Sequence, residues 1–122
     1  MRIEYDLKLG FKDVMIRPKR STLKSRSQVN LDRDFKFLHS SYTWEGIPIM
    51  AANMDTVGTF EMAKALSQKK LFTTIHKHYS IDDWNLFCST APKGIENYIA
   101  ISTGTSNKDS EKLAAIFNFN PH

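Results

Sequence analysis

The sequence predicts an α/β fold in which three strand–helix units build a parallel sheet. Three short β-prone runs start at Ile47, Leu71 and Tyr98, and a helical pattern follows each of them. Because two parallel strands need a crossover helix between them, such repeats indicate neighbouring parallel strands. Each run ends in polar residues, which should gather at one edge of the sheet. The pattern allows an open doubly wound sheet or the front of an eight-stranded barrel, which takes about 250 residues when complete.

The composition is that of one soluble domain. The chain has 122 residues, of which 41% are hydrophobic and 25% charged, enough for one core but not for two full domains. Cys88 is the only cysteine, which excludes an internal disulfide and a cysteine-based metal cluster and favours a reducing compartment. The acidic start and the lack of a membrane-length apolar run predict a cytoplasmic protein without a secretory signal.

The first 46 residues are expected to form a basic loop and a capping strand. The net charge is +4, and lysines and arginines concentrate between positions 8 and 26. This run predicts a solvated loop; nucleic-acid binding is the alternative, although no aromatic residues for base stacking are interleaved. Apolar and polar residues alternate over 29–37, which predicts a half-buried strand, and residues 44–46 predict a turn.

The central prediction concerns residues 47–60, in which a strand turns into a helix. Residues 47–52 form a short apolar run that suits a strand buried on both faces. Polar residues and a glycine follow, and Thr59 should cap a helix with an apolar stripe at Phe60, Ala63 and Leu66. The loop 53–56 is therefore the first place to look for ligand-binding groups.

The second unit combines a β-prone run at residues 71–75 with a cluster of basic side chains. His76 and His78 would point the same way on an extended segment, so a metal pair is conceivable, but no third ligand is obvious. The lysine between them is better placed to meet a phosphate or an amide of a ligand. Ser80 and Asp83 have capping-box spacing and predict the start of the second helix.

The third unit has its β-prone run at residues 98–101. Ser106 and Asp109 repeat the capping pattern at the start of the third helix. Gly104 stands alone where a dinucleotide fingerprint needs three glycines, which argues against a glycine-rich phosphate loop. Cys88, on the second predicted helix, is interpreted as a small buried hydrophobic residue rather than a nucleophile.

Four segments resemble the amino-terminal third of the IMP dehydrogenase/GMP reductase family. They are residues 9–27 (LGFKDVMIRPKRSTLKSRS), 47–66 (IPIMAANMDTVGTFEMAKAL), 75–80 (IHKHYS) and 101–106 (ISTGTS). The resemblance covers essentially the whole chain in the family's order. The early loop and the direct passage from IHKHYS into the next helix resemble the reductase branch, because the dehydrogenases usually insert a regulatory domain there.

The resemblance implies a (β/α)8 TIM barrel with one catalytic domain. Residues 1–46 would supply its cap and residues 47–122 three βα units. It implies NADPH-dependent conversion of GMP to IMP and ammonia by a homo-oligomer, a tetramer in the family, with no nucleic acid, membrane or metal site. The positions that match the family's cofactor-binding residues are Ser25, Arg26, Lys77 and Thr105, and those that match its nucleotide-binding loop are Asn53 and Met54. Ser25 and Arg26 match a loop that reaches the cofactor of a neighbouring subunit, and Thr105 is expected on the nicotinamide side.

One departure limits what the resemblance implies. The family's nucleophilic cysteine, proton-relay residues and monovalent-cation loop lie on later strands that have no counterpart in these 122 residues, and Cys88 does not match the nucleophile's motif. We therefore expect the chain alone to contain no catalytic residue, to be inert with GMP and NADPH, and to associate through exposed apolar surface. The alternatives are a truncated nucleotide-binding or subunit-interaction module and, more weakly, a basic nucleic-acid-binding domain.

Overall fold

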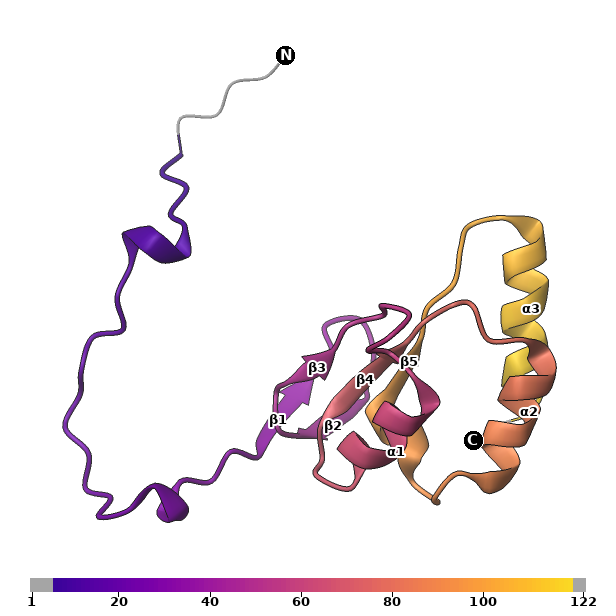
Figure 1. Cartoon of the computed structure of the whole chain (residues 1–122). Coiled ribbons are helices and arrows are strands. Elements are labelled where there is room, and N and C mark those ends of the chain that lie inside the picture. Colours follow the sequence, from indigo (N-terminus) through magenta and orange to yellow (C-terminus); the bar gives the residue numbers. More distant parts are fainter. Residues whose placement is uncertain (1–5, 120–122) are drawn as a thin grey trace.

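A three-stranded parallel sheet lies at the centre of this computed structural model, which describes residues 6–119 (Figure 1). The sheet runs in the order β3 (Met50–Ala51), β4 (Phe72–Ile75) and β5 (Ile99–Ile101). Both pairings are parallel, as the strand–helix repeats predict. The α/β class and the parallel sheet are thus confirmed, whereas the described residues do not close into a barrel.

One helix follows each strand of this sheet: α1 (Phe60–Ser67), α2 (Ile81–Thr90) and α3 (Asn107–Phe117). The helices start where the capping residues predict. The hydroxyl of Thr59 caps α1 by accepting a hydrogen bond from a backbone N–H of the first turn. Capping boxes join Ser80 to Asp83 and Ser106 to Asp109, because the side chain of each residue bonds the backbone N–H of the other. Local hydrogen bonds therefore set the start of each helix.

A two-stranded antiparallel hairpin lies against the amino end of the sheet. It consists of β1 (Arg33–Lys36) and β2 (Thr43–Gly46). Its Trp44 is only 7% exposed and meets the rings of Phe72 and Tyr98 edge-on, with centroids 5.9 and 6.2 Å away. The indole Nε1 also donates a hydrogen bond to the backbone carbonyl of Asn97 at 2.9 Å. These contacts fix the hairpin at the starts of β4 and β5.

The hairpin corrects two sequence predictions. Residues 44–46 form part of β2 instead of the predicted turn, because Trp44 finds its packing partners far along the chain. The strand predicted over 29–37 is shorter, and its apolar side chains are exposed rather than half-buried, with Phe35 43% and Phe37 49% exposed. Within residues 6–119, β1 pairs with β2 alone, so much of its surface stays in contact with solvent.

β3 also differs from the prediction of a strand buried on both faces. Only two residues of the predicted run 47–52 form the strand, and Ile49 and Met50 are 60% and 61% exposed. β3 lies at the edge of the sheet, and only β4 pairs with it in the described part of the chain. Burial of an edge strand requires a further element to cover it. The third strand begins one residue later than predicted, because Tyr98 belongs to the 3-10 turn η3 (Ile95–Tyr98).

A stack of aromatic rings forms the centre of the core between the helices and β4. The Phe60 ring lies 3.7 Å from the Tyr79 ring and 4.2 Å from the Phe87 ring, measured between centroids, and both neighbours are nearly parallel to it. Trp84, which is 2% exposed, meets Phe60 edge-on at 5.0 Å. Each such pair contributes about 0.5–1.5 kcal/mol beyond the area that it buries. The other face of Tyr79 stacks on His76 at 4.3 Å, so the stack extends from the core to the end of β4.

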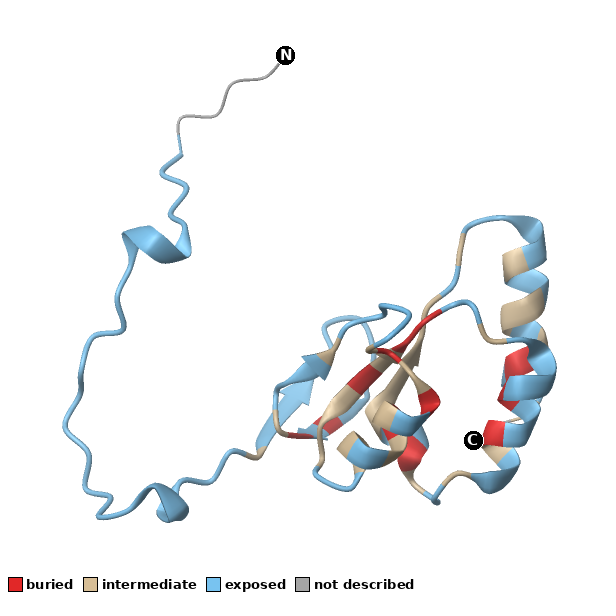
Figure 2. Ribbon diagram, in the orientation of Figure 1, coloured by how far each residue is buried: buried red, intermediate tan, exposed pale blue. Residues whose placement is uncertain are grey.

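The residues before the hairpin form an arm that leads away from the sheet (Figure 1). Its regular segments are the short turns η1 (Phe11–Asp13) and η2 (Arg26–Gln28). Residues 6–31 are all exposed, including the apolar Phe11, Met15 and Ile16, and Figure 2 shows no buried position on the arm. The basic segment is therefore solvent-exposed, as predicted. No helix within residues 6–119 is long and apolar enough to cross a membrane.

Replacing Phe60 by alanine should strongly destabilise this core. The change removes the ring that Tyr79, Trp84 and Phe87 contact and leaves a cavity, so we expect the free energy of unfolding to fall by about 3–5 kcal/mol. Phe117→Ala is the matched control, because that ring is 59% exposed, and it should change this free energy by about 0.5 kcal/mol or less. Urea titration followed by circular dichroism measures both. Equal losses in the two variants would contradict the assignment of the core.

Candidate functional site

The loops that follow β3, β4 and β5 meet at the carboxyl edge of the sheet. The Asn53 amide donates a hydrogen bond from Nδ2 to the Ser102 hydroxyl at 2.8 Å, which joins the loops after the two outer strands. His78 Nε2 lies 3.1 Å from a carboxylate oxygen of Asp55, which joins the loops after β4 and β3. Both side chains of this second pair are largely exposed, so solvent screens their attraction. The predicted convergence of the polar strand ends is confirmed.

The loop after β3 is pressed against β4 and requires glycine at position 58. The backbone N–H of His76 donates to the Gly58 carbonyl at 3.0 Å, and the Gly58 N–H donates to the Met54 carbonyl at 2.8 Å. A Cβ atom at Gly58 would overlap the Thr74 carbonyl oxygen and would lie 2.7 Å from that of Ala52. These backbone contacts fix the position of Met54, whose side chain is 59% exposed, relative to the end of β4.

The two histidines after β4 do not form the equivalent pair that an extended segment would give. A turn at Lys77 and His78 follows the strand, so this segment is not extended. His76 is 8% exposed, stacks on Tyr79, and accepts the backbone N–H of His78 at Nδ1 over 3.3 Å. The His78 side chain is 58% exposed and faces Asp55. Residues 6–119 contain no group of three or more His, Cys, Asp or Glu side chains placed to hold a metal ion.

The turn after β4 exposes Lys77 at the same edge of the sheet. Its backbone carbonyl accepts a hydrogen bond from Lys112 Nζ of α3 at 2.7 Å. The hydrogen bond from Ser106 lowers the pKa of Asp109, and the positive charges of Lys77 and Lys112 lower it further. Sequence reasoning places Ser102 among the polar strand ends that should converge, but it missed Lys112 as a member of this cluster. The only sequence signal for Lys112 is its position one helical turn after Asp109, where it lies on the same face of the predicted helix.

The other predicted ligand positions lie at different distances from this edge. Thr105 is exposed in the loop that leads from β5 into α3, and no hydrogen bond or ion pair engages its side chain within residues 6–119. Ser25 and Arg26 lie on the arm, where the Ser25 hydroxyl accepts the Ser27 N–H at 3.3 Å and caps η2. Figure 1 shows η2 well away from the carboxyl edge. The structure therefore brings together Asn53, Met54 and the Lys77 turn, but not the two arm residues.

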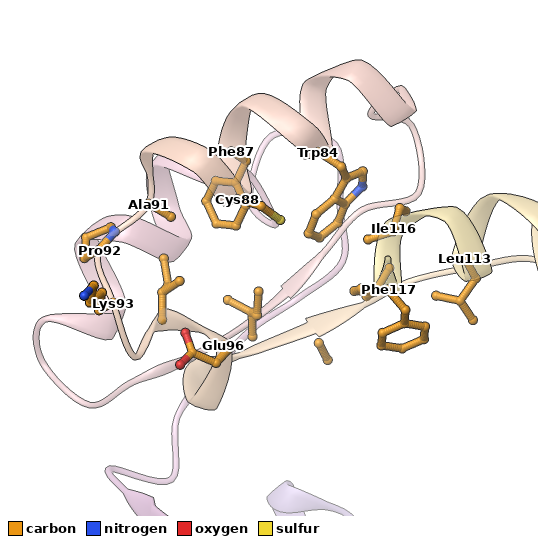
Figure 3. Close-up of a pocket in the computed structure, with 14 residues that line it drawn as sticks. Trp84, Phe87, Cys88, Ala91, Pro92, Lys93, Glu96, Leu113, Ile116 and Phe117 are labelled. Carbon is orange, nitrogen blue, oxygen red and sulfur yellow. The ribbon is translucent and has the colours of Figure 1, made fainter. Parts of the chain in front are cut away.

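An apolar groove of about 650 Å³ lies between α2, η3, β5 and α3 (Figure 3). Trp84, Phe87 and Cys88 line it from α2, and Ile116 lines it from α3. Cys88 is half-buried, and burial raises the pKa of its thiol above the usual value. The cysteine therefore stays protonated at neutral pH and packs as a small hydrophobic side chain.

Comparison with known proteins identifies the relatives of this chain. The family model described as the IMP dehydrogenase/GMP reductase domain matches residues 8–88. The chain is 62% identical over 121 residues to the GMP reductase of Citrobacter koseri and 60% identical over 121 residues to those of Salmonella typhi and Salmonella newport. Each match covers 99% of this chain and 35% of the relative, so the chain spans about a third of the length of these curated relatives.

Replacing Gly58 by alanine should disturb the loop after β3 at the carboxyl edge of the sheet. The added methyl group meets backbone oxygens, which cannot move aside as a flexible side chain would. We expect the free energy of unfolding to fall by about 1–3 kcal/mol, and amide hydrogen exchange in residues 53–58 to become faster. Gly10→Ala is the control, because a Cβ there meets only the Asp13 carboxylate at 3.4 Å. Unchanged exchange in Gly58→Ala would refute the close packing of this loop.

Proposed function

The chain belongs to the IMP dehydrogenase/GMP reductase family, and on this basis we propose that it forms the amino-terminal third of a GMP reductase. The proposed reaction converts GMP, NADPH and protons to IMP, NADP and ammonium. The observation that carries the proposal is the convergence of the loops that carry Asn53 and Lys77 at the carboxyl edge of a parallel sheet. Ligands of α/β proteins bind at that edge, because the loops there are not required to pack the core.

We propose that the three βα units are part of a TIM barrel. Three features support this: the strands are parallel, β3 and β5 each have an unpaired edge within residues 6–119, and a hairpin lies against the amino end of the sheet. The face that carries Met50 and Thr74 leaves the Met50 side chain 61% exposed. Closure into a barrel removes both edges and buries this face as the barrel interior.

The carboxyl edge has side chains suited to an anionic dinucleotide. The Lys77 side chain is exposed, and within residues 6–119 no hydrogen bond or ion pair engages its ammonium group. That ammonium is therefore available to a phosphate or an amide of the cofactor. NADPH would supply the hydride when bound, and Thr105 is proposed to lie on its nicotinamide side. Ser25 and Arg26 are proposed to meet the cofactor of a neighbouring subunit, which agrees with an arm that leads away from its own sheet (Figure 1).

We propose that the loop after β3 contributes to the nucleotide site. The Asn53 amide donates through Nδ2 to Ser102, which orients its carbonyl oxygen as an acceptor for a ligand. Met54 offers an exposed, polarisable thioether to a purine ring. Gly58 and β4 hold this loop through backbone hydrogen bonds, so its geometry is set before a ligand arrives.

A chimaeric enzyme tests this function directly. Residues 1–121 of this chain replace the matching third of the Citrobacter koseri GMP reductase, and GMP-dependent NADPH oxidation is followed by absorbance. We expect a rate within about tenfold of the intact relative, since the two chains are 62% identical over a match that covers 99% of this chain. The 122-residue chain alone should give no oxidation. A folded but inactive chimaera would refute the proposed function, and activity of the chain alone would refute the assignment of the chemistry to the remaining two thirds.

Lys77→Met in this chimaera tests the cofactor contact. Loss of a charge-assisted hydrogen bond costs about 1.5–3 kcal/mol, so the KM for NADPH should rise by about 10–100-fold. Lys69→Met is the matched control, because Lys69 is an exposed lysine beyond the end of α1, and it should leave the KM unchanged. Equal KM values in the two variants would exclude Lys77 from the cofactor site.

A further inference from the structure

The turn that carries Lys77 is held by a second lysine, Lys112, which lies on α3. Lys112 Nζ donates to the Lys77 backbone carbonyl at 2.7 Å and so joins α3 to the turn after β4, 35 residues away. A hydrogen bond from an ammonium group is about twice as strong as one between neutral partners. Lys112 is half-buried, although the bond itself lies in an exposed environment. The contact therefore ties α3 directly to the backbone of the Lys77 turn.

The charge of Lys112 acts on two carboxylates. They belong to Asp83 and Asp109, which occupy equivalent capping positions at the starts of α2 and α3. Hydrogen bonds from Ser80 and Ser106 lower the pKa values of these carboxyls, and the Lys112 charge lowers both further. Both groups are therefore ionised at neutral pH. The Lys112 charge therefore acts at both helix starts, and its hydrogen bond joins α3 to the Lys77 carbonyl.

The neighbours of Lys77 are fixed by other contacts. The backbone N–H of His76 is bonded to Gly58, and the N–H of His78 is bonded to the His76 ring. The Ser80 N–H donates to the Asp83 carboxylate at 2.8 Å. At Lys77 itself, the Lys112 ammonium bonds the backbone carbonyl. The turn is thus anchored on one flank by the loop after β3, on the other flank by the first turn of α2, and at its centre by α3.

We propose that Lys112 is a positioning residue that fixes the Lys77 turn and so presents the Lys77 ammonium to the phosphate groups of the cofactor. This inference rests on the proposed function. The two lysines have different roles. The Lys112 ammonium donates a hydrogen bond to a backbone carbonyl, whereas the Lys77 ammonium has no hydrogen bond or ion pair within the described residues. Lys112 therefore acts through Lys77 and does not contact the ligand.

Kinetics of the chimaeric enzyme test this role. Lys112→Met keeps the aliphatic stem and removes the donor, so we expect the KM for NADPH to rise about five- to tenfold while kcat stays within about twofold. Lys112→Arg retains donors and should restore most of the binding. Lys108→Met is the matched control, because Lys108 is an exposed lysine on the same helix, and it should change neither constant. A loss of kcat and thermal stability without a rise in KM would overturn the proposal.

Hydrogen exchange of the 122-residue chain gives a readout that does not need activity. Amides of residues 77–80 should exchange faster in Lys112→Met than in Lys108→Met, because the turn loses its central anchor. Unchanged exchange would overturn the positioning role, whatever the kinetics. An inactive chimaera carrying the unmodified chain would refute the proposed function instead, and faster exchange in Lys112→Met would then still support the anchor.

Discussion

The stack of rings around Phe60 is the interaction on which the rest of the structure depends. The strands of the sheet have only two to four residues, so their hydrogen bonds alone cannot hold three βα units together. Phe60 lies in the first turn of α1, Phe87 lies in α2, and Tyr79 lies in the turn between β4 and α2. The Tyr79 hydroxyl also accepts the Phe60 backbone N–H at 3.2 Å. One cluster therefore joins two helices to the loop that carries the candidate site.

The features that the sequence predicts correctly are those decided by neighbouring residues. Ser80 and Asp83 are three positions apart, and their mutual hydrogen bonds need nothing from the rest of the chain. The features that it predicts incorrectly depend on distant partners. Trp44 belongs to a strand because Phe72 and Tyr98 bury its ring, and these partners cannot be identified from the residues around Trp44. Burial of β3 likewise depends on which strands pair with it.

The same distinction between local and long-range contacts applies to the candidate site. Asn53 and Lys77 can be predicted from the sequence, because polar residues after a β-prone run mark the end of a strand, and parallel strand ends share an edge. The same argument places Ser102 at this edge, whereas Lys112 cannot be found in this way, because its contact with the Lys77 carbonyl joins residues 35 positions apart. A lysine inside a predicted helix has the appearance of an ordinary surface residue, and only the packing of α3 beside α2 brings it to the Lys77 carbonyl.

The exposed apolar side chains show how the proposed assembly would be stabilised. On the body, Ile49 and Met50 are exposed at the edge strand, and Phe117 is exposed beside the apolar groove. On the arm, Met15 and Ile16 are more than nine-tenths exposed, at 94% and 97%. Burial of such a side chain contributes about 1.5–3 kcal/mol, so both regions favour partners that cover them.

The body surfaces lie where further barrel strands and helices would pack. The arm extends beyond its own sheet, which suits contact with a second subunit, as proposed for Ser25 and Arg26 (Figure 1). Completion of the barrel and association of subunits would therefore be driven by different apolar surfaces.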